Sequence, residues 1–167
     1  MSEFDLSSSS SATPKAKMIL AAVIAVALLF GWVAVRRQLG GMIAEMTPST
    51  DPNAPAAAEL ARSMAPSDPI TLWLKANLER NIFSPERTSA AIKLYEDTVR
   101  LSPNDFRWWI ELGRAYEQAE MNDRAEASLR RAIALAPTYT FPRWQFGNFL
   151  LRQGRTDEAF AEFKAAT

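Results

Sequence analysis

The sequence predicts an all-α protein in which a solenoid of repeated helix pairs follows one long apolar helix and a flexible linker. Two observations lead to this prediction. The same residue classes return every 34 residues through the later part of the chain, and 18 uncharged residues stand in one run near the N-terminus. A period of this length is typical of stacked helical repeats, and no stretch alternates apolar and polar residues as a half-buried strand does.

Residues 1–14 are polar and include the serine run Ser7–Ser11. A segment with so few apolar side chains buries too little surface to offset the entropy lost on ordering it. We therefore expect a disordered tail that acts as a solvated spacer, with a phosphorylated segment as the alternative.

Residues 15–37 are expected to form a single transmembrane helix. The run Met18–Val35 holds 18 residues without a charge. At ~1.5 Å per residue it reaches about 27 Å, close to the ~30 Å hydrocarbon core of a bilayer. Trp32 lies near one end, where interfacial tryptophan is common. Basic residues whose long side chains can reach the lipid headgroups flank both ends: Lys15, Lys17, Arg36 and Arg37.

A cleaved signal peptide is the alternative for this run. Its apolar core would be shorter, and a cleavage site of small residues would follow within a few positions, whereas Arg36 and Arg37 follow here. Two basic residues at each end leave the positive-inside rule without a preference. We expect a single-pass protein of the bacterial inner (cytoplasmic) membrane, with a short cytoplasmic tail and the repeats in the periplasm.

Small residues form two notches along this apolar helix, of a kind that lets a second transmembrane helix approach closely. They are Ala21, Ala25, Ala27 and Gly31. One interpretation is a transmembrane helix partner. The other is that common small residues fill positions that face lipid.

Residues 38–67 are expected to form a flexible linker rich in proline and alanine. Prolines interrupt any long helix there, and Gly40 and Gly41 are expected to loosen the exit from the membrane. The prolines are Pro48, Pro52, Pro55 and Pro66. Only residues 56–65 are expected to form a short helix, so that the repeats stand away from the bilayer.

Residues 68–167 are expected to fold as six helices in three pairs with short loops. Asp68-Pro69 and Ser84-Pro85 each place a capping side chain directly before a proline in the first helical turn. The expected helices are 69–82, 86–101, 106–119, 123–135, 141–153 and 157–167, in repeats of about 72–105, 106–139 and 140–167.

The expected core positions follow from the repeat itself. A shift of 34 residues pairs Leu112 with Phe146, Gly113 with Gly147, Tyr116 with Leu150, Ala125 with Ala159, Leu129 with Phe163 and Ala132 with Ala166. The reverse shift places Leu78, Ala91, Tyr95 and Pro103 on Leu112, Ala125, Leu129 and Pro137. Glycine inside a helix costs roughly 1 kcal/mol relative to alanine, so we expect Gly113 and Gly147 where paired helices cross closely.

This pattern resembles the tetratricopeptide repeat (TPR). The middle copy carries the resemblance through Trp109-x-x-Leu112-Gly113-x-x-Tyr116, then Ala125-x-x-x-Leu129, Ala132 and Pro137, and the likeness extends over roughly residues 70–167. The family implies a TPR-type α-solenoid of about three helix-turn-helix repeats. Such arrays present an extended concave surface to their partners.

The last expected helix carries Phe160 and Phe163, and no polar helix follows them in the sequence. Terminal repeats normally need a polar outer face. We expect either a partner that covers these aromatic rings or a longer repeat array.

The composition argues against an enzyme and against a nucleic-acid-binding protein. Histidine and cysteine are absent, which removes the commonest general base and the imidazole and thiolate metal ligands. Lysine plus arginine and aspartate plus glutamate number 19 each, so no net field attracts nucleic acid. Carboxylates adjacent in sequence do not face each other on a helix. No catalytic, cofactor-binding or metal-binding residue is expected.

The resemblance implies a partner-binding groove lined by the first helix of each pair. Its expected lining is Trp73, Arg80, Arg107, Ile110, Arg114, Glu117, Phe141, Trp144, Asn148, Leu151 and Arg152. Arginine beside aromatic rings suits a peptide that carries carboxylates, and ordinary surface charge is the alternative. The lysine–asparagine clamp of some TPR domains is not matched, because Trp144 stands where the clamp has lysine.

These expectations combine into a membrane-anchored protein–protein interaction adaptor or scaffold. It would recruit a protein or peptide partner through its groove during the assembly of bacterial envelope complexes. The alternative is a structural accessory subunit of a multi-subunit membrane complex, held mainly by its transmembrane helix. The two hypotheses differ in whether the groove or the membrane helix makes the main contact.

Overall fold

The computed structural model describes residues 13–166, and within that range it contains eight α-helices and no strand. The prediction of an all-α fold is confirmed. The helices are α1 (Pro14–Met46), α2 (Ala54–Met64), α3 (Pro69–Arg80), α4 (Pro85–Leu101), α5 (Phe106–Gln118), α6 (Asn122–Leu135), α7 (Thr140–Arg152) and α8 (Thr156–Ala165). The serine run of the expected polar tail lies outside the described residues.

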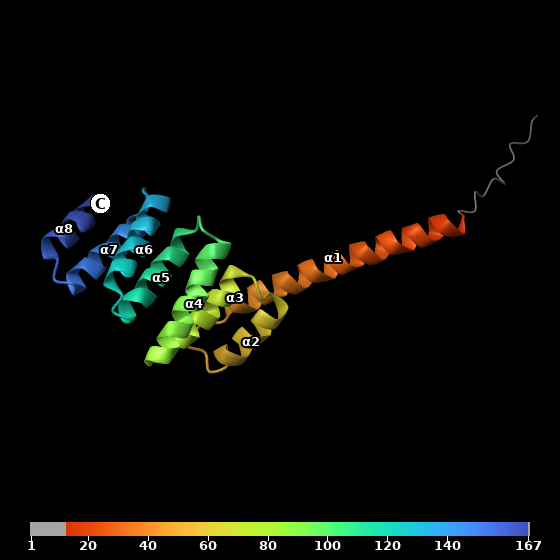
Figure 1. Cartoon of the computed structure of the whole chain (residues 1–167), viewed down its shortest axis with the longest axis horizontal. Helices are drawn as coiled ribbons and strands as arrows, with labels where there is room; N and C mark the ends of the chain where they lie inside the picture. The colour runs from red at the N-terminus through yellow and green to blue at the C-terminus, as the bar shows by residue number, and fades with distance from the viewer. Residues whose placement is uncertain (1–12, 167) are drawn as a thin grey trace, which may run out of the picture. The chain divides into compact units, whose positions relative to one another are not determined.

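Helices α3 to α8 form three antiparallel pairs, and each helix contacts the next one in the chain (Figure 1). Helix α5 also contacts α7, so the first helices of successive pairs lie beside one another. The six expected helices begin and end within two residues of the observed ones, which is the ordinary uncertainty of a helix boundary. The repeats therefore fold as the 34-residue period predicts.

Three of the expected helix starts carry a capping side chain. The Asp68 carboxylate accepts a hydrogen bond from the backbone N–H of Ile70 at 3.0 Å, and the Ser84 hydroxyl accepts one from Arg87 at 3.3 Å. Asp105 accepts from the N–H of residue 107 at 3.1 Å. These bonds satisfy N–H groups that the first turn of a helix leaves without a partner.

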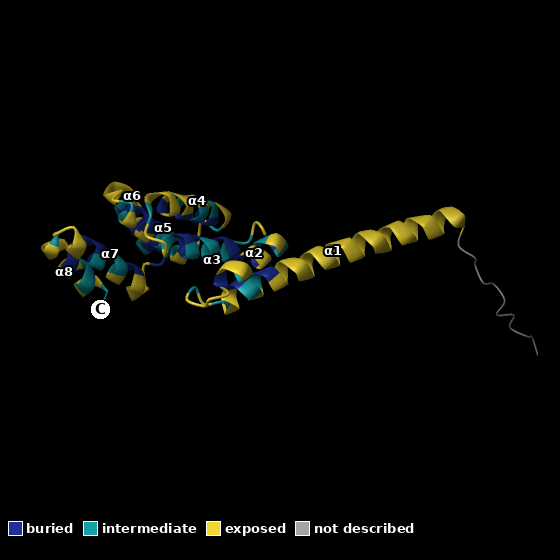
Figure 2. Cartoon of the chain, turned by 90° about the horizontal axis from the view of Figure 1, so that it is seen from below, coloured by how far each residue is buried: buried dark blue, intermediate teal, exposed yellow. Residues whose placement is uncertain are grey.

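The core of the repeats lies between the paired helices, where dark blue marks the buried residues in Figure 2. Ala125 is fully buried, and Leu129 is 2% exposed. A Cβ atom on Gly147 would overlap the ring of Phe163. The expected alternation of small and large side chains at the helix crossings is therefore present. Phe163 is partly buried under Gly147, while Phe160 remains 63% exposed.

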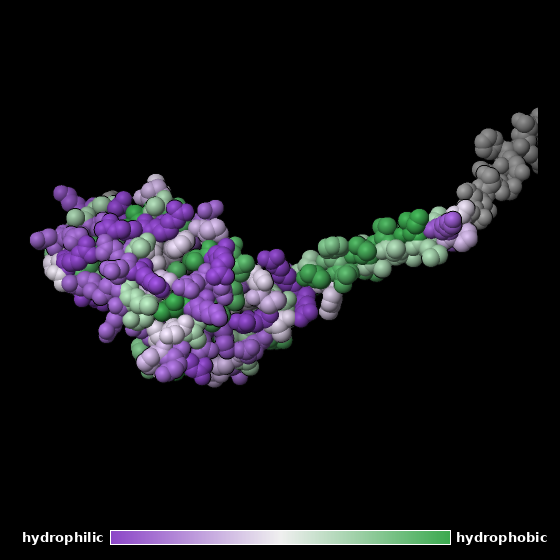
Figure 3. Space-filling model, viewed as in Figure 1, coloured by the Kyte–Doolittle hydropathy of each residue, from purple (hydrophilic) through white to green (hydrophobic). Residues whose placement is uncertain are grey.

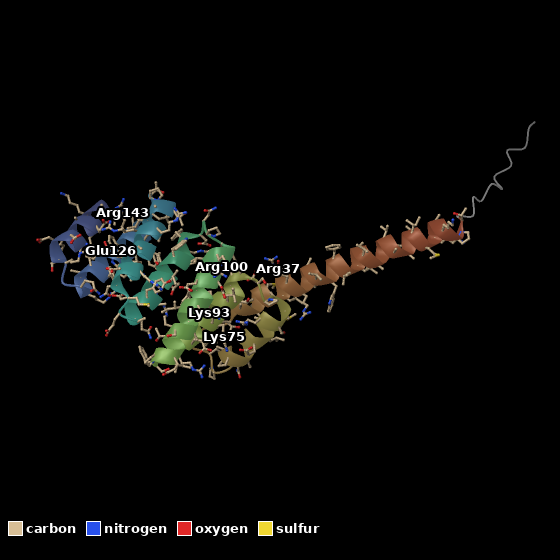
Figure 4. All side chains as sticks on the ribbon, viewed as in Figure 1. Arg37, Lys75, Lys93, Arg100, Glu126 and Arg143 are labelled. Atoms are coloured by element: carbon tan, nitrogen blue, oxygen red, sulfur yellow. The ribbon has the colours of Figure 1, made fainter. Side chains whose placement is uncertain are left out.

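The expected flexible linker is wrong for most of its length. Helix α1 continues to Met46, and α2 fills Ala54–Met64. Ala44, Ala58, Ala61 and Leu74 form a buried cluster that joins these helices to α3. Lys75 of α3, labelled in Figure 4, donates a hydrogen bond to Glu59 of α2 at 2.6 Å. The prolines lie in turns or in the first turn of a helix, where they do not interrupt hydrogen bonding.

Gly40 has the opposite role from the one expected for it. A Cβ atom at this position would lie 2.8 Å from Ala65 Cβ and 2.9 Å from the carbonyl oxygen of Ala61. The glycine therefore lets α1 approach α2 closely and does not loosen the chain. Alanine-rich segments pack well in this way because their small side chains allow backbones to come together. From the sequence, the alanines of this segment predicted only a flexible linker.

The chain divides into two compact units, residues 1–36 and 37–167. The described residues of the first unit, 13–36, belong almost entirely to α1 and are all exposed. In Figure 3 the surface of α1 is mostly hydrophobic. By length and composition α1 is the one helix among the described residues that is able to cross a membrane, with a mean hydropathy of 2.8 in its most apolar window. A signal sequence passes the same test.

Candidate functional site

An open groove of about 710 Å³ lies along the first helices of the three pairs. Helix α3 and the turn after it supply one side, α5 supplies the middle, and α7 supplies the far side. The lining residues are Arg80, Asn81, Phe83, Arg114, Glu117, Gln118, Trp144, Gln145, Asn148 and Arg152. The groove arises because successive first helices share one face of the stack, as the helical period requires.

A partly buried polar network forms the floor of the groove at its α3 end. Arg80 donates a hydrogen bond to the Asn77 Oδ1 atom at 2.9 Å, and the buried Tyr95 hydroxyl donates to the same oxygen at 2.8 Å. Burial raises the pKa of the Tyr95 phenol well above its usual value, so the hydroxyl stays a donor. Arg80 also pairs with Glu111 at 2.9 Å. The network fixes the Arg80 side chain, which is only 12% exposed.

The groove contains one cation more than its local carboxylates balance. Glu111 is shared, because its second oxygen lies 3.3 Å from Arg114 while the first pairs with Arg80. Arg152 has a carboxylate of its own, since it contacts both oxygens of Glu117 at 2.6 and 2.8 Å. Three guanidinium groups thus face two carboxylates. Arg114 is 46% exposed, and its hydrogen bond to Glu111 at 3.3 Å is the longest of the three arginine–carboxylate contacts, so it is the cation most free to take an anionic group.

Two aromatic side chains stand at the edges of the groove. Trp144 is 51% exposed and stacks on Phe141, with ring centroids 6.2 Å apart and planes inclined by 18°. Phe83, in the turn between α3 and α4, is 91% exposed. Exposed aromatic rings and arginine are the residues that most often dominate protein interfaces. The arrangement suits a polypeptide segment that carries a carboxylate and an apolar side chain.

The structure brings six of the eleven expected groove residues together. They are Arg80, Arg114, Glu117, Trp144, Asn148 and Arg152. The Asn148 amide donates to the carbonyl oxygen of Trp144 at 2.9 Å, which orients its side chain along α7. These positions follow the register that the 34-residue period assigns to the first helices.

Five expected residues lie elsewhere. Ile110 is 1% exposed and belongs to the core, so its assignment to the groove is wrong. Trp73 is partly buried against the core, with its ring centroid 6.2 Å from that of Trp108. Arg107 pairs with its own helix cap, Asp105, at 2.6 Å. Phe141 and Leu151 are exposed outside the groove lining.

Ile110 and Arg114 show why the period alone does not give the lining. They are four residues apart on α5 and therefore on the same face of the helix, yet Ile110 is buried and Arg114 is 46% exposed. The period places a residue on a face, and the neighbouring helices decide how deeply it is buried.

Sequence reasoning missed four groove residues. They are Asn81, Phe83, Gln118 and Gln145. Asn81 and Phe83 lie in or next to a turn, whereas the helical register predicts groove-lining residues only within helices. The one signal for Phe83 was the apolar pair Ile82-Phe83 in a turn, where an aromatic ring has little to pack on.

Within residues 13–166, no group of three or more histidine, cysteine, aspartate or glutamate side chains is arranged to hold a metal ion. The adjacent carboxylates Asp157 and Glu158 lie in the first turn of α8. Glu158 pairs with Arg155 at 2.6 Å. The charges there belong to helix ends and ion pairs, and nothing in the described part of the chain points to catalysis.

Residues 86–140 match the model of the tetratricopeptide repeat family. A search among curated proteins gave no match. The chain is similar to solved structures of MamA. MamA residues 41 to the end, from Desulfovibrio magneticus RS-1, superpose with a TM-score of 0.62 at 18% identity, covering 80% of this chain and 73% of that one. Another crystal structure of MamA gives 0.61 at 18% identity, with 80% and 75% covered.

A third structure, MamA AMB-1, superposes with a TM-score of 0.58 at 22% identity and covers 80% of this chain and 76% of that one. Identities this low establish a shared fold and no shared partner. Together with the family match, they identify the fold of the repeat unit as a TPR-type α-solenoid. Proteins of this fold serve chiefly as interaction scaffolds, so protein–protein interaction is the class of function that the fold supports.

Proposed function

We propose that the chain is a membrane-anchored adaptor that recruits a protein or peptide partner through the groove between α3, α5 and α7. The observation that carries the proposal is the uneven pairing of the groove arginines. Arg114 shares a carboxylate that Arg80 already neutralises, whereas Arg152 has one to itself. A partner carboxylate gains a charge-assisted contact with Arg114 without breaking either of the stronger pairs.

The membrane part of the proposal rests on α1. Its apolar window is uncharged and fully exposed within its own unit, and such a surface is expensive in water and favourable in lipid. We place the protein in the inner (cytoplasmic) membrane of a bacterium, single-pass, with the repeats in the periplasm and a role in assembling envelope complexes. The proposal includes neither an enzymatic activity nor nucleic-acid binding.

Quantitative affinity purification of the full chain from the membranes of its native cells tests the groove. Arg114→Glu should remove the partner, because it replaces the unbalanced cation with an anion beside Glu111. Arg131→Glu is the matched control, since Arg131 is exposed on α6, away from the groove. Equal partner recovery with both variants would exclude the groove as the recruiting surface.

The location needs a separate experiment. Protease added to intact spheroplasts should digest the repeats, and mass spectrometry of the undigested membrane protein should find residues 14–46 still joined to them. A mature protein that begins after residue 35 would instead identify α1 as a cleaved signal sequence. Digestion only after the inner membrane is ruptured would place the repeats in the cytoplasm.

A structural subunit held by its membrane helix is the second candidate. It is suggested by the small residues Ala21, Ala25, Ala27 and Gly31, all of which are exposed on α1. Small side chains let a second transmembrane helix approach closely. Replacing all four residues with leucine should release the chain from its complex if this candidate is right. An adaptor of the kind proposed keeps its partner after that change.

A further inference from the structure

A second hollow adjoins the groove on the other side of Phe83. It measures about 560 Å³ and lies between the start of α4 and the turn from α5 to α6. Its lining is Phe83, Ser84, Pro85, Thr88, Ser89, Ile92, Gln118, Ala119, Glu120, Met121 and Arg124. We call it the turn hollow. The peptide-binding groove does not account for it, because it faces the turns between helices.

Apolar side chains dominate the accessible part of the turn hollow. Phe83 is 91% exposed and Met121 is 41% exposed, and they stand with the partly buried Ile92 and with Pro85 and Ala119. Leaving this much apolar surface in water is unfavourable. Methionine adapts its shape to an incoming group. The hollow is therefore suited to hold a single apolar side chain and contributes no strong charge selectivity of its own.

Two residues belong to both hollows, Phe83 and Gln118. The Gln118 amide is held in place, because its Nε2 donates to the carbonyl oxygen of Arg80 at 3.1 Å and lies 3.4 Å from the Thr88 hydroxyl. The wall between the hollows thus consists of the Gln118 amide, held by hydrogen bonds, and the exposed ring of Phe83. A chain that leaves the groove past Gln118 enters the turn hollow directly.

We propose that the partner segment held by the groove continues over this wall and places an aliphatic or aromatic side chain in the turn hollow. The inference rests on the proposed function of the groove and adds a specificity to it. The ligand is a peptide segment with two anchors, a carboxylate at Arg114 and an apolar side chain between Phe83, Ile92 and Met121. A peptide with only one of the two anchors would contact either the groove or the turn hollow, but not both.

The helical register of α5 sets the spacing of the two anchors. Arg114 and Gln118 are one turn apart, about 6 Å along the helix. An extended peptide advances about 3.3 Å per residue, and its side chains return to the same side every second residue. Gln118 belongs to the wall and the turn hollow lies beyond it, so the apolar anchor should stand at least two residues from the acidic one in the partner sequence.

Selection from a random peptide library identifies the ligand without knowledge of the natural partner. The full chain in lipid nanodiscs is the target, and empty nanodiscs remove peptides that bind lipid. The enriched peptides should carry an aspartate or glutamate at least two residues from a leucine, isoleucine, methionine or phenylalanine. Their dissociation constants are then measured with a fluorescent label on wild-type protein and on variants.

Phe83→Ser and Met121→Ser should each raise the dissociation constant of the selected peptides about tenfold or more, since each removes the burial of a large apolar side chain. Phe160→Ser is the matched control, because Phe160 is also an exposed large apolar residue, at 63%, but lines neither hollow. A peptide in which serine replaces the apolar anchor should have the same dissociation constant for these variants as for the wild-type protein. The melting temperature of each variant checks that it folds.

The outcomes separate the two proposals. Peptides that lose affinity with Arg114→Glu and keep it with both Phe83→Ser and Met121→Ser would overturn the turn hollow and leave the groove in place. A selection that yields no peptide, or only peptides insensitive to Arg114→Glu, would overturn the groove and the turn hollow together.

Discussion

Gly113 of α5 lies directly against the side chain of Leu129 where α5 and α6 cross. A Cβ atom on the glycine would lie 2.9 Å from Leu129 Cγ and 3.3 Å from the carbonyl oxygen of Ala125. The side chain of Leu129 therefore lies directly against the α5 backbone. Glycine inside a helix costs roughly 1 kcal/mol relative to alanine, and the close packing of a buried leucine offsets that cost.

Overpacking this crossing should destabilise the repeats. Ala125 is fully buried, and Ala125→Leu has no free volume for the added methyl groups, so we expect a loss of roughly 1–3 kcal/mol in the free energy of unfolding. Ala161→Leu is the control, because Ala161 is exposed on α8. Thermal unfolding followed by circular dichroism measures both. Equal melting temperatures for the two variants would mean that the crossing is not packed as described.

The contact between the end of α1 and α2 gives a second packing test with adjacent residues. Gly40→Val should expose α2, because its Cβ would lie 2.8 Å from Ala65, whereas Gly41→Val meets nothing nearer than an Asp68 oxygen at 4.0 Å. Both changes put the same residue into the same helix. Hydrogen–deuterium exchange should therefore rise over Ala54–Met64 in the first variant only. Similar exchange in both variants would indicate that residues 38–67 form the flexible linker that the sequence predicted.

The ion pairs between α6 and α8 predict a pH dependence. Hydrogen bonding from Arg155 and from Arg130 holds the pKa of Glu126, labelled in Figure 4, below its ordinary value of 4.5. A folded-state pKa that is lowered adds stability above the unfolded pKa, and this stability is lost as the pH falls through the folded pKa. Wild type should exceed Glu126→Gln in melting temperature at pH 7, and the difference should shrink as the pH falls below 4.5 and vanish once the pH is below the lowered folded-state pKa. A constant difference would contradict the pairing.

Glu117 and Arg152 join the first helices of two repeats across the groove. Their two hydrogen bonds measure 2.6 and 2.8 Å, but Arg152 is 53% exposed. Solvent screening then limits the expected coupling to about 0.2–1 kcal/mol in a double-mutant cycle with Glu117→Ala and Arg152→Ala. The coupling should fall in 1 M salt. A coupling of zero at low salt would mean that the pair does not hold α5 to α7.

The sequence allowed the helices and their packing to be predicted where a physical rule acts within one repeat. Asp68, Ser84 and Asp105 cap the helices at their expected positions, because a side-chain oxygen before a helix satisfies local N–H groups. Gly113 lies at the expected crossing because the 34-residue period fixes which small residue faces which large one.

The rest depends on contacts that lie outside the period. Prolines and small residues in 38–67 favoured a linker, yet Ala44 and Ala61 pack with Leu74 of α3 in one buried cluster, and Gly40 lies against Ala61 and Ala65. Ile110 is buried because it packs into the core cluster of the repeats. Phe83 was not predicted because it lies in a turn, between the groove and the turn hollow. A helical register predicts the direction of a side chain only within a helix.

The measurement that tests recruitment through the groove most directly is photocrosslinking in living cells. A photoreactive benzoylphenylalanine replaces either Gln145, which lines the groove, or Arg131, which lies on the exposed face of α6. We expect one partner to crosslink from position 145 and not from 131, and that crosslink to disappear when Arg114→Glu is added. The same partner crosslinking equally from both positions, or from 145 regardless of Arg114→Glu, would contradict the account.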